Sequence, residues 1–458
     1  MSETHEVDVV VVGLGPGGEA VASGAAEAGL EVVGIDRRLV GGECPYYGCI
    51  PSKMMLEAAH RLQTAGSIQG VAGSADVHPD FTPVATRIRD EATTDWDDAS
   101  AVERLTGAGI TFVRGEARLT GPKQVEVDGT TYAARVGVVL NVGTQPATPS
   151  IPGLADTPFW TNQEVVKVTE VPASLIVVGG GPIGVEMAQA FAGFGCRVTL
   201  LEGGDRILGP DEPEASQALA GVLAEQGVQV LDGVQIERVD HADGSFTVTT
   251  TSGGQTQELT ADKLLVAAGR ITQLQGLGLE TVGVDPEAHR LDVDERCRVV
   301  GAEGLWAVGD VTGKGAYTHV SMYQSAIVVP DLQGEDGPTG DYRAVPHVTY
   351  TDPEVAGVGM TEQAARDAGL TVNVGSYDLG ASTRGWIAGA SGLVKLVEDA
   401  DRGVLVGGTV VGPAAGEIVA MLTVAVHAEV PVERLLSMMY AFPALHRAVE
   451  NAVKDLRA

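Results

Sequence analysis

Two cysteines, Cys44 and Cys49, lie close together in the segment GGECPYYGCIPSK, residues 41–53. They are two of only four cysteines in 458 residues. A pair so close could bind a metal, form a structural crosslink, pack in a core or perform redox chemistry. A metal site is disfavoured because no nearby histidine or second cysteine pair completes a ligand set. The elements around the pair decide among the remaining possibilities.

The composition is typical of a soluble α/β protein with many tight turns, since 44% of residues are hydrophobic and 61 are glycine. The length suggests about three domains. No apolar run approaches the roughly 20 residues that span a bilayer, and the start, MSETHEVDVV, lacks the layout of a signal peptide. We therefore expect a cytoplasmic protein, in which a structural disulfide is disfavoured because the compartment keeps thiols reduced.

The charge is strongly negative, with 30 basic and 61 acidic residues and a formal net charge of −31. Such a surface repels the phosphates of nucleic acids and anionic lipid headgroups. We therefore expect neither nucleic acid nor a membrane as a partner.

A first nucleotide-binding pattern opens the chain. An apolar, β-branched run over residues 7–12 predicts a buried parallel strand. Gly13, Gly15 and Gly18 follow with the spacing G-x-G-x-x-G, then an alanine-rich helical segment and a second apolar run that ends at Asp36. These glycines permit a tight turn and backbone approach to a pyrophosphate, while the acid accepts hydrogen bonds from a ribose. The sequence therefore predicts a dinucleotide-binding βαβ unit.

The same pattern recurs after a predicted strand over residues 175–178, with Gly179, Gly181 and Gly184 and a terminal acid at Glu202. A repeated nucleotide-binding unit implies two dinucleotides brought together. Glu202 would bind a free 2′-hydroxyl and repel a 2′-phosphate, and no arginine follows it directly. We therefore expect NAD(H) rather than NADP(H) at this second site.

Gly309 and Asp310 stand between a predicted strand and a predicted helix. An aspartate at such a strand end could hold the hydroxyls of a polyol. From about residue 341 the chain has strands and helices but no further glycine pattern.

Seven motifs occur in order along nearly the whole chain: GLGPGG, GGECPYYGCIPSK, GTQPATPSIPG, GGGPIGVE, AAGR, AVGD and TDPEVAGVG. With them the sequence resembles the pyridine nucleotide–disulfide oxidoreductases, the group of dihydrolipoamide dehydrogenase, glutathione reductase and mercuric reductase. The resemblance implies an α/β fold with two Rossmann-like domains, for FAD and NAD, and a C-terminal α+β dimerisation domain. It also implies a homodimer whose subunits share each active site. The implied domains are residues 1–149 (first part of the FAD domain), 150–271 (NAD), 272–340 (central, completing the FAD site) and 341–458 (interface).

The resemblance assigns the redox-active disulfide to Cys44 and Cys49. It implies Cys49 as the charge-transfer thiolate nearest the flavin and Cys44 as the interchange thiol. Residues five apart in a regular helix rise about 7.5 Å, more than the usual Cα separation of a disulfide. We therefore expect the segment to start with a non-helical turn, with Pro45 in the first helical position directly after Cys44. A thiol at a helix N-terminus is also pushed toward the reactive thiolate.

The resemblance further implies that Lys53 lies near the reactive flavin nitrogen, that Glu186 pairs with Lys53, and that Asp310 binds the ribityl chain. No metal ligand is implied. The implied cofactor-binding positions are Gly13, Gly15, Pro16, Gly17, Gly18, Asp36, Arg37, Gly42, Glu43, Lys53, Gly143, Gly179, Gly181, Ile183, Gly184, Glu202, Gly269, Arg270, Gly309 and Asp310.

The C-terminal stretch AFPALHRAVENAVKDL departs from the family pattern. Disulfide-reducing members usually carry a histidine and a glutamate, in a pattern like H-P-x-x-x-E, whereas Phe442 and Arg447 occupy these positions here. Phenylalanine cannot transfer a proton, and arginine cannot orient an imidazole as a carboxylate does.

Two hypotheses follow from this departure. In the first, His446 replaces the missing histidine and Glu450, four residues on, orients it. In the second, electrons leave to a quinone, an activated double bond or a metal ion, and Phe442, Tyr46 and Tyr47 line a pocket for a flat molecule. We favour the first, an enzyme of the FAD-dependent NAD(P)H–disulfide oxidoreductase type (EC 1.8.1-like) acting on a small disulfide or dithiol. A redox sensor that binds both dinucleotides without turnover is the rival class.

Overall fold

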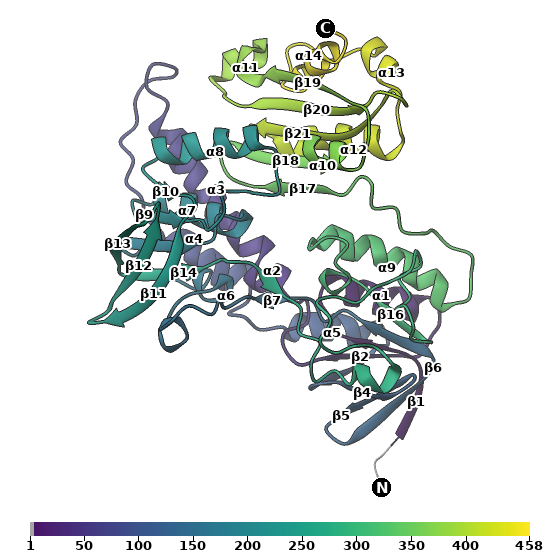
Figure 1. The fold of residues 1–458 in the computed structure, drawn as a ribbon. Helices are drawn as coiled ribbons and strands as arrows, with labels where there is room; N and C mark the ends of the chain where they lie inside the picture. The colour runs from purple at the N-terminus through teal and green to yellow at the C-terminus, as the bar shows by residue number, and fades with distance from the viewer. Residues whose placement is uncertain (1–3) are drawn as a thin grey trace. The chain divides into compact units, whose positions relative to one another are not determined.

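The structure, a computed structural model, describes residues 4–458. The chain divides into two compact units, each built from separate stretches (Figure 1). The first unit contains the residues up to Pro51 together with Thr86–Ala147 and Arg270–Tyr342. The second contains Ser52–Ala85, Thr148–Gly269 and Arg343–Ala458. None of the helices in residues 4–458 is both long enough and apolar enough to cross a membrane.

The first unit is built around a mostly parallel sheet with β1 at its centre. On one side β1 pairs in parallel with β2, and β2 with β3. On the other side it pairs in parallel with β6, a long strand that also pairs with β5 and with β16. The strands of this sheet are β1 (Thr4–Val12), β2 (Val32–Asp36), β3 (Thr111–Arg114), β4 (Arg118–Gly121), β5 (Gln124–Val127), β6 (Thr130–Leu140) and β16 (Leu305–Ala307).

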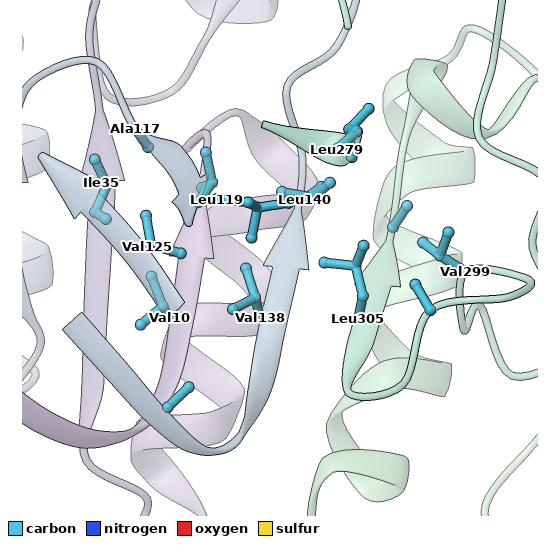
Figure 2. Packing of buried hydrophobic residues seen from close by; sticks show 14 of the residues in the cluster. Val10, Ile35, Ala117, Leu119, Val125, Val138, Leu140, Leu279, Val299 and Leu305 are labelled. Atoms are coloured by element: carbon cyan, nitrogen blue, oxygen red, sulfur yellow. The ribbon is translucent and has the colours of Figure 1, made fainter. Parts of the chain in front are cut away.

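Both faces of β1 are covered, as its apolar run predicts. Val10 packs with side chains of β6 and β16 and with Leu279 on one face, the cluster drawn in Figure 2. Val9 and Val11 face the opposite cluster. Helices α1 (Pro16–Glu27), α5 (Ala99–Gly107) and α9 (Thr318–Leu332) contribute to this second cluster. The alternation explains why a strand buried on both sides reads as continuous valine.

The second unit contains the second nucleotide fold predicted from the glycine pattern. Its sheet is fully parallel, in the order β10-β9-β8-β14, and all five residues of β8 are buried. An antiparallel meander of β11, β12 and β13 follows β10 in the chain. The bounds are β8 (Ser174–Val178), α7 (Pro182–Gly193), β9 (Arg197–Leu201), α8 (Pro213–Glu225), β10 (Gln229–Leu231), β11 (Gln235–Ala242), β12 (Ser245–Ser252), β13 (Gln255–Ala261) and β14 (Lys263–Val266).

The C-terminal part of the second unit is α+β, again as predicted. An antiparallel sheet runs in the order β17-β18-β21-β20-β19, and α12 and α14 share one core with it. The bounds are β17 (Pro346–Thr349), β18 (Glu354–Gly359), α10 (Glu362–Asp367), β19 (Val372–Asp378), α11 (Thr383–Ala388), β20 (Leu393–Asp399), β21 (Val404–Gly412), α12 (Ala415–His427), α13 (Val432–Ser437) and α14 (Arg447–Asp455).

The cysteine segment folds as two helices, α2 (Glu43–Tyr47) and α3 (Cys49–Gly66). Gly48 interrupts them with φ −133° and ψ −112°. The non-helical turn was expected at the start of the segment, but the structure places the break at Gly48, directly before Cys49. The expected place of Pro45 is also wrong. Helix α2 begins before Cys44, with Gly42 as its N-cap, so Pro45 is the third helical residue. A glycine at φ +67° at position 42 lets the helix start two residues earlier than proline alone would indicate.

Candidate active site

The loop between β1 and α1 admits only glycine at two positions. Gly13 has φ +88°, and a Cβ there would lie 2.3 Å from the backbone oxygen of Asn141. A Cβ on Gly18 would lie 2.0 Å from the backbone oxygen of Gly13. The remaining predicted positions, Gly15, Pro16 and Gly17, form the start of α1. The loop therefore turns tightly and presents the amide end of a long helix, as a pyrophosphate site requires.

The loop between β8 and α7 repeats this geometry. Gly179 has φ +106°, and its Cβ would lie 2.4 Å from the oxygen of Ala267. A Cβ on Gly184 would lie 1.9 Å from the oxygen of Gly179. A Cβ on the middle glycine, Gly181, would meet no atom within 4 Å. The space before the start of α7, which also carries Ile183, therefore fits the close approach of a dinucleotide.

Asp36 closes the first nucleotide unit. One carboxylate oxygen accepts the N–H of Leu14 at 2.7 Å, and the other accepts the N–H of Arg38 at 2.7 Å. Burial raises the pKa of Asp36. Arg37, also predicted to bind cofactor, forms an ion pair with Glu116 on the exposed surface.

Glu202 occupies the equivalent place in the second unit. It accepts the N–H of Gly180 and the N–H of Gly204, each at 2.6 Å. The two acids make the same contact with their glycine loops. Asp36 accepts the N–H of Leu14, which follows Gly13, and Glu202 accepts the N–H of Gly180, which follows Gly179. Both carboxylates stand at the strand end beside a glycine loop, where a ribose diol would bind.

Asn141 is a site residue that sequence reasoning missed. It is buried directly after β6; its side-chain oxygen accepts the N–H of Gly18 at 2.8 Å, and its amide donates to the carbonyl of Val308 at 3.0 Å. A Cβ on Gly309 would lie 2.7 Å from that amide nitrogen. Its only sequence signal is a polar residue at the end of an apolar run. Asn141 therefore braces the first glycine loop against the strand end that carries Asp310.

Three predicted cofactor positions, Glu43, Arg270 and Asp310, meet through Thr144, which was not predicted. Arg270 donates to the Glu43 carboxylate at 2.5 Å and to the carbonyl and hydroxyl oxygens of Thr144, both at 2.8 Å. The Thr144 hydroxyl donates to Asp310 at 2.8 Å. Gly143 and Gly269 precede two of these residues, and a Cβ on either would meet no atom within 4 Å. The network joins the start of α2 to the strand end at Asp310.

The cysteine segment starts directly against the first glycine loop, because a Cβ on Gly42 would lie 2.8 Å from the Cα of Gly15. Cys44 is half-buried in α2, whereas Cys49 is exposed as the first residue of α3. The Cys49 sulfur lies 3.6 Å from the hydroxyl of Thr318, the first residue of α9. Two helix N-termini therefore adjoin this sulfur, and both favour the thiolate.

The other two cysteines differ from Cys44 and Cys49 in their burial. Cys196 and Cys297 are buried, and burial raises the pKa of Cys196 to about 12 and that of Cys297 to about 11. Both thiols stay protonated at neutral pH. They are packing residues.

Lys53 and Glu186 form the ion pair that the resemblance implied. The Lys53 ammonium lies 2.9 and 2.7 Å from the two carboxylate oxygens, and the N–H of Tyr350 donates to Glu186 at 2.9 Å. The ammonium also lies 4.9 Å from the centre of the Tyr350 ring. Because Lys53 follows Cys49 by four residues in α3, the helix fixes the ammonium one turn beyond the thiol.

The C-terminal residues do not form the predicted replacement pair. His446 is the N-cap of α14, and its ring lies 6.2 Å from that of Tyr440. Glu450 instead pairs with Arg447 at 2.9 Å and with Lys454 at 2.7 Å. Throughout residues 4–458, no hydrogen bond or ion pair joins His446 to Glu450. The spacing argument fails because His446 lies at the helix boundary, while the two cations lie on the same helical face as Glu450.

The predicted aromatic pocket also needs correction. Phe442 is 68% exposed, with the Arg447 guanidinium 5.4 Å from its ring centre. Tyr46, however, is buried, and burial raises its pKa. Its ring therefore packs inside the first unit instead of lining an open surface. Of the two tyrosines between the cysteines, only Tyr47 is partly exposed.

The two dinucleotide folds, with a cysteine pair that starts against the first glycine loop, define a flavin- and nicotinamide-dependent oxidoreductase. Residues 7–326 match the family model described as pyridine nucleotide-disulphide oxidoreductase, and residues 345–453 match the dimerisation domain of the same family. The chain belongs to the pyridine nucleotide-disulphide oxidoreductase family. It is an FAD-dependent oxidoreductase with a C-terminal dimerisation domain.

Named relatives extend over the whole chain. A dihydrolipoyl dehydrogenase from Thermus scotoductus is 34% identical and covers 98% of this chain and 97% of its own length. A mercuric reductase from Acidithiobacillus ferrooxidans is 32% identical over 100% of this chain and 84% of its own. The copper(II) complex of the HOCl-induced flavoprotein disulfide reductase RclA from Escherichia coli is 26% identical, with a TM-score of 0.85 over 98% of this chain and 99% of that one.

Proposed function

We propose that this protein uses NADH to reduce a small disulfide, or runs the reverse reaction on a dithiol, through a redox pair formed by Cys44 and Cys49. The observation that carries the proposal is the placement of Cys49. Its sulfur lies at the starts of α3 and α9, on the segment that begins against the first glycine loop. FAD, held by the first glycine loop with Asp36 and Asp310, would supply the two-electron transfer between the nicotinamide dinucleotide and the disulfide.

The residues of the chain would then act as a thiol–disulfide exchange pair. Two electrons break the Cys44–Cys49 bond, leaving Cys49 as a thiolate stabilised by two helix N-termini and Cys44 as the more weakly stabilised thiol. Cys44 loses its proton, attacks the substrate disulfide and expels one substrate thiolate. Cys49 attacks the resulting mixed disulfide, which restores the protein disulfide and releases the second substrate thiolate. NADH and one proton supply the balance of electrons and hydrogen.

The choice of NADH rests on the surroundings of Glu202. Its carboxylate lies at the expected place of the adenosine ribose, where it would repel a 2′-phosphate. Arg206 is the nearest candidate to bind such a phosphate, but its guanidinium already donates to the carbonyls of Gly209 and Asp211 at 2.5 and 3.1 Å. A second carboxyl group, that of Asp232, lies near Glu202: burial, and then the negative charges of Glu202 and Asp205, raise the pKa of Asp232.

A second acceptor class, a soft metal ion, is favoured by one observation. In the part of the chain that the structure describes, Glu450 forms ion pairs with Arg447 and Lys454, and none with His446. A soft metal ion needs no proton, because two thiolates bind it directly and the two electrons reduce it. This candidate is supported by two similar proteins, a protein named mercuric reductase and RclA, whose structure is a copper(II) complex.

An acceptor panel with NADH distinguishes these classes. Small disulfides, quinones and mercuric ion are compared on the wild type, on His446→Ala and on His427→Ala as a control at the end of α12. Turnover of disulfides that falls only in His446→Ala supports the proposed disulfide activity with His446 as the acid–base group. Turnover of quinones or metal ions alone, unchanged in both variants, overturns the disulfide proposal.

The dimerisation domain leads us to propose a homodimer in which the C-terminal segment of one subunit completes the site of the other. The domain boundaries and the cytoplasmic location remain predictions from the sequence.

A further inference from the structure

The segment that precedes α5 has an unusual backbone. It follows a π-helical turn, Ile88–Ala92. Three consecutive residues that are not glycine, Thr94, Asp95 and Trp96, have φ of +50°, +55° and +56°. This left-handed conformation is disfavoured for L-residues and persists only where surrounding contacts fix it. π-helical turns also occur often at functional sites. The contacts made by this segment therefore need an explanation.

Two side chains of the segment hold the cysteine loop. The indole N–H of Trp96 donates to the carbonyl of Tyr46 at 3.0 Å, between the two cysteines. The carboxylate of Asp98 accepts the N–H of Val40 at 2.7 Å, just before the loop. The segment thus touches the loop on both sides of Cys44.

The Tyr46 carbonyl lies in the last turn of α2, a helix of five residues. The last carbonyls of a helix have no partner within that helix and must be satisfied from outside. The helix then breaks at Gly48, so nothing in α2 itself continues the turn toward Cys49. The Trp96 indole therefore acts as a side-chain cap on the short helix that sets the spacing of the two cysteines.

The segment is itself firmly anchored. Asp98 is buried and forms an ion pair with Arg114 at 2.5 Å. The buried Thr93 hydroxyl donates to the carbonyl of Ile88 at 3.0 Å, and the N–H of Asp95 donates to Arg89 at 2.6 Å. The left-handed turn is therefore a fixed support that aims the indole at the loop.

We propose that Trp96 is a positioning residue for the Cys44–Cys49 pair, and that its hydrogen bond to Tyr46 stabilises the dithiol relative to the disulfide. The proposal rests on the proposed redox function of the pair. The hydrogen bond is present while Cys44 and Cys49 are both thiols. A disulfide forms only over a narrow range of geometries, so a turn that is fixed in its dithiol form opposes the change that closing the disulfide requires.

The test compares Trp96→Phe, which keeps an aromatic ring but loses the N–H, with Trp386→Phe as a control. Trp386 is 77% exposed on α11. The FAD-loaded proteins are equilibrated with mixtures of oxidised and reduced dithiothreitol, and the thiols of Cys44 and Cys49 are counted by alkylation and mass spectrometry. Loss of one hydrogen bond predicts a shift of about fivefold toward the disulfide. That factor corresponds to a fall in reduction potential of about 20 mV for two electrons.

A second measurement uses the wild type alone and therefore tests the proposal even if Trp96→Phe does not fold. Because coupling is reciprocal, the dithiol must protect the Trp96 indole N–H from hydrogen exchange by the same factor of about five relative to the disulfide. Equal protection in both states, or equal equilibria in Trp96→Phe and the wild type, overturns the positioning role alone. A wild-type pair that never interconverts between disulfide and dithiol instead contradicts the proposed function.

Discussion

Both carboxylate oxygens of Glu186 accept a hydrogen bond from one ammonium group, that of Lys53, at 2.9 and 2.7 Å. The Glu186 side chain is 4% exposed and that of Lys53 is 35% exposed. A buried carboxylate thus depends on a partly exposed partner that lies in the same helix as Cys49. Removing the lysine would leave a charge in the interior with only the Tyr350 N–H to stabilise it.

We expect Lys53→Met to lower the free energy of unfolding by about 2 kcal/mol, less than for a fully buried pair because solvent reaches the lysine. Glu186→Gln in the same chain should restore part of the loss, since no buried charge remains. Denaturant unfolding of the two single variants and the double variant measures this coupling. Additive losses in the double variant would show that the pair contributes nothing as a pair.

Reduction by one equivalent of NADH should expose two new alkylatable thiols in the wild type, at Cys44 and Cys49. Cys49→Ser should show no such gain and no long-wavelength absorption band on reduction. Cys44→Ser should keep the band, because Cys49 alone provides the thiolate. Cys196→Ser serves as the control, and normal disulfide turnover in either loop variant would show that the pair is not redox-active.

Glu202→Gln should reduce the preference for NADH over NADPH by about tenfold, the amount expected when a hydrogen bond to a charged group and its repulsion are removed. Asp205→Asn is a matched control, because the Asp205 side chain is exposed and forms its ion pair with Arg206, outside the glycine loop. The ratio of kcat/KM for the two donors measures the preference. An unchanged ratio in Glu202→Gln would remove this acid from the specificity site.

The buried thiols predict a loss of stability at alkaline pH. Because burial raises the pKa of Cys297 from 9.0 to about 11, the native protein keeps a proton that the unfolded chain releases. This stabilisation is complete below about pH 9 and disappears as the pH rises through 11. At pH 10 it amounts to about 1 kcal/mol. Unfolding of the wild type and Cys297→Ala between pH 8 and 10.5 should therefore show a steeper decline in the wild type.

Phe442→His combined with Arg447→Glu should increase disulfide turnover if the chemistry is disulfide exchange, because it restores an imidazole and a carboxylate at the family positions. The new carboxylate stands three residues from Glu450, so like charges on α14 should also lower stability. Each single variant, which restores only half of the pair, is the matched control. No gain in the double variant would indicate that the acceptor needs no proton.

The parts of the site that sequence patterns predicted are those determined locally. The roles of Gly13 and Gly179 depend on a tight turn between a strand and the next helix, so spacing alone reveals them. Asn141 and Thr144 escaped prediction because their partners come from other strand ends that only the folded sheet brings near. Pairing of His446 with Glu450 was expected from spacing, but two neighbouring cations compete for the same carboxylate.

The pairing of β6 with three neighbouring strands has a consequence for the order in which the two units fold during synthesis. Strand β16, from the third stretch of the first unit, joins β6 from its second stretch and, through β6, β1 from its first. The parallel sheet of β8, β9, β10 and β14 lies within one continuous stretch, Thr148–Gly269. On the ribosome, where domains fold as they emerge, that sheet can close while the first unit still awaits its last strand. The segment translated first therefore completes its fold after the one translated next.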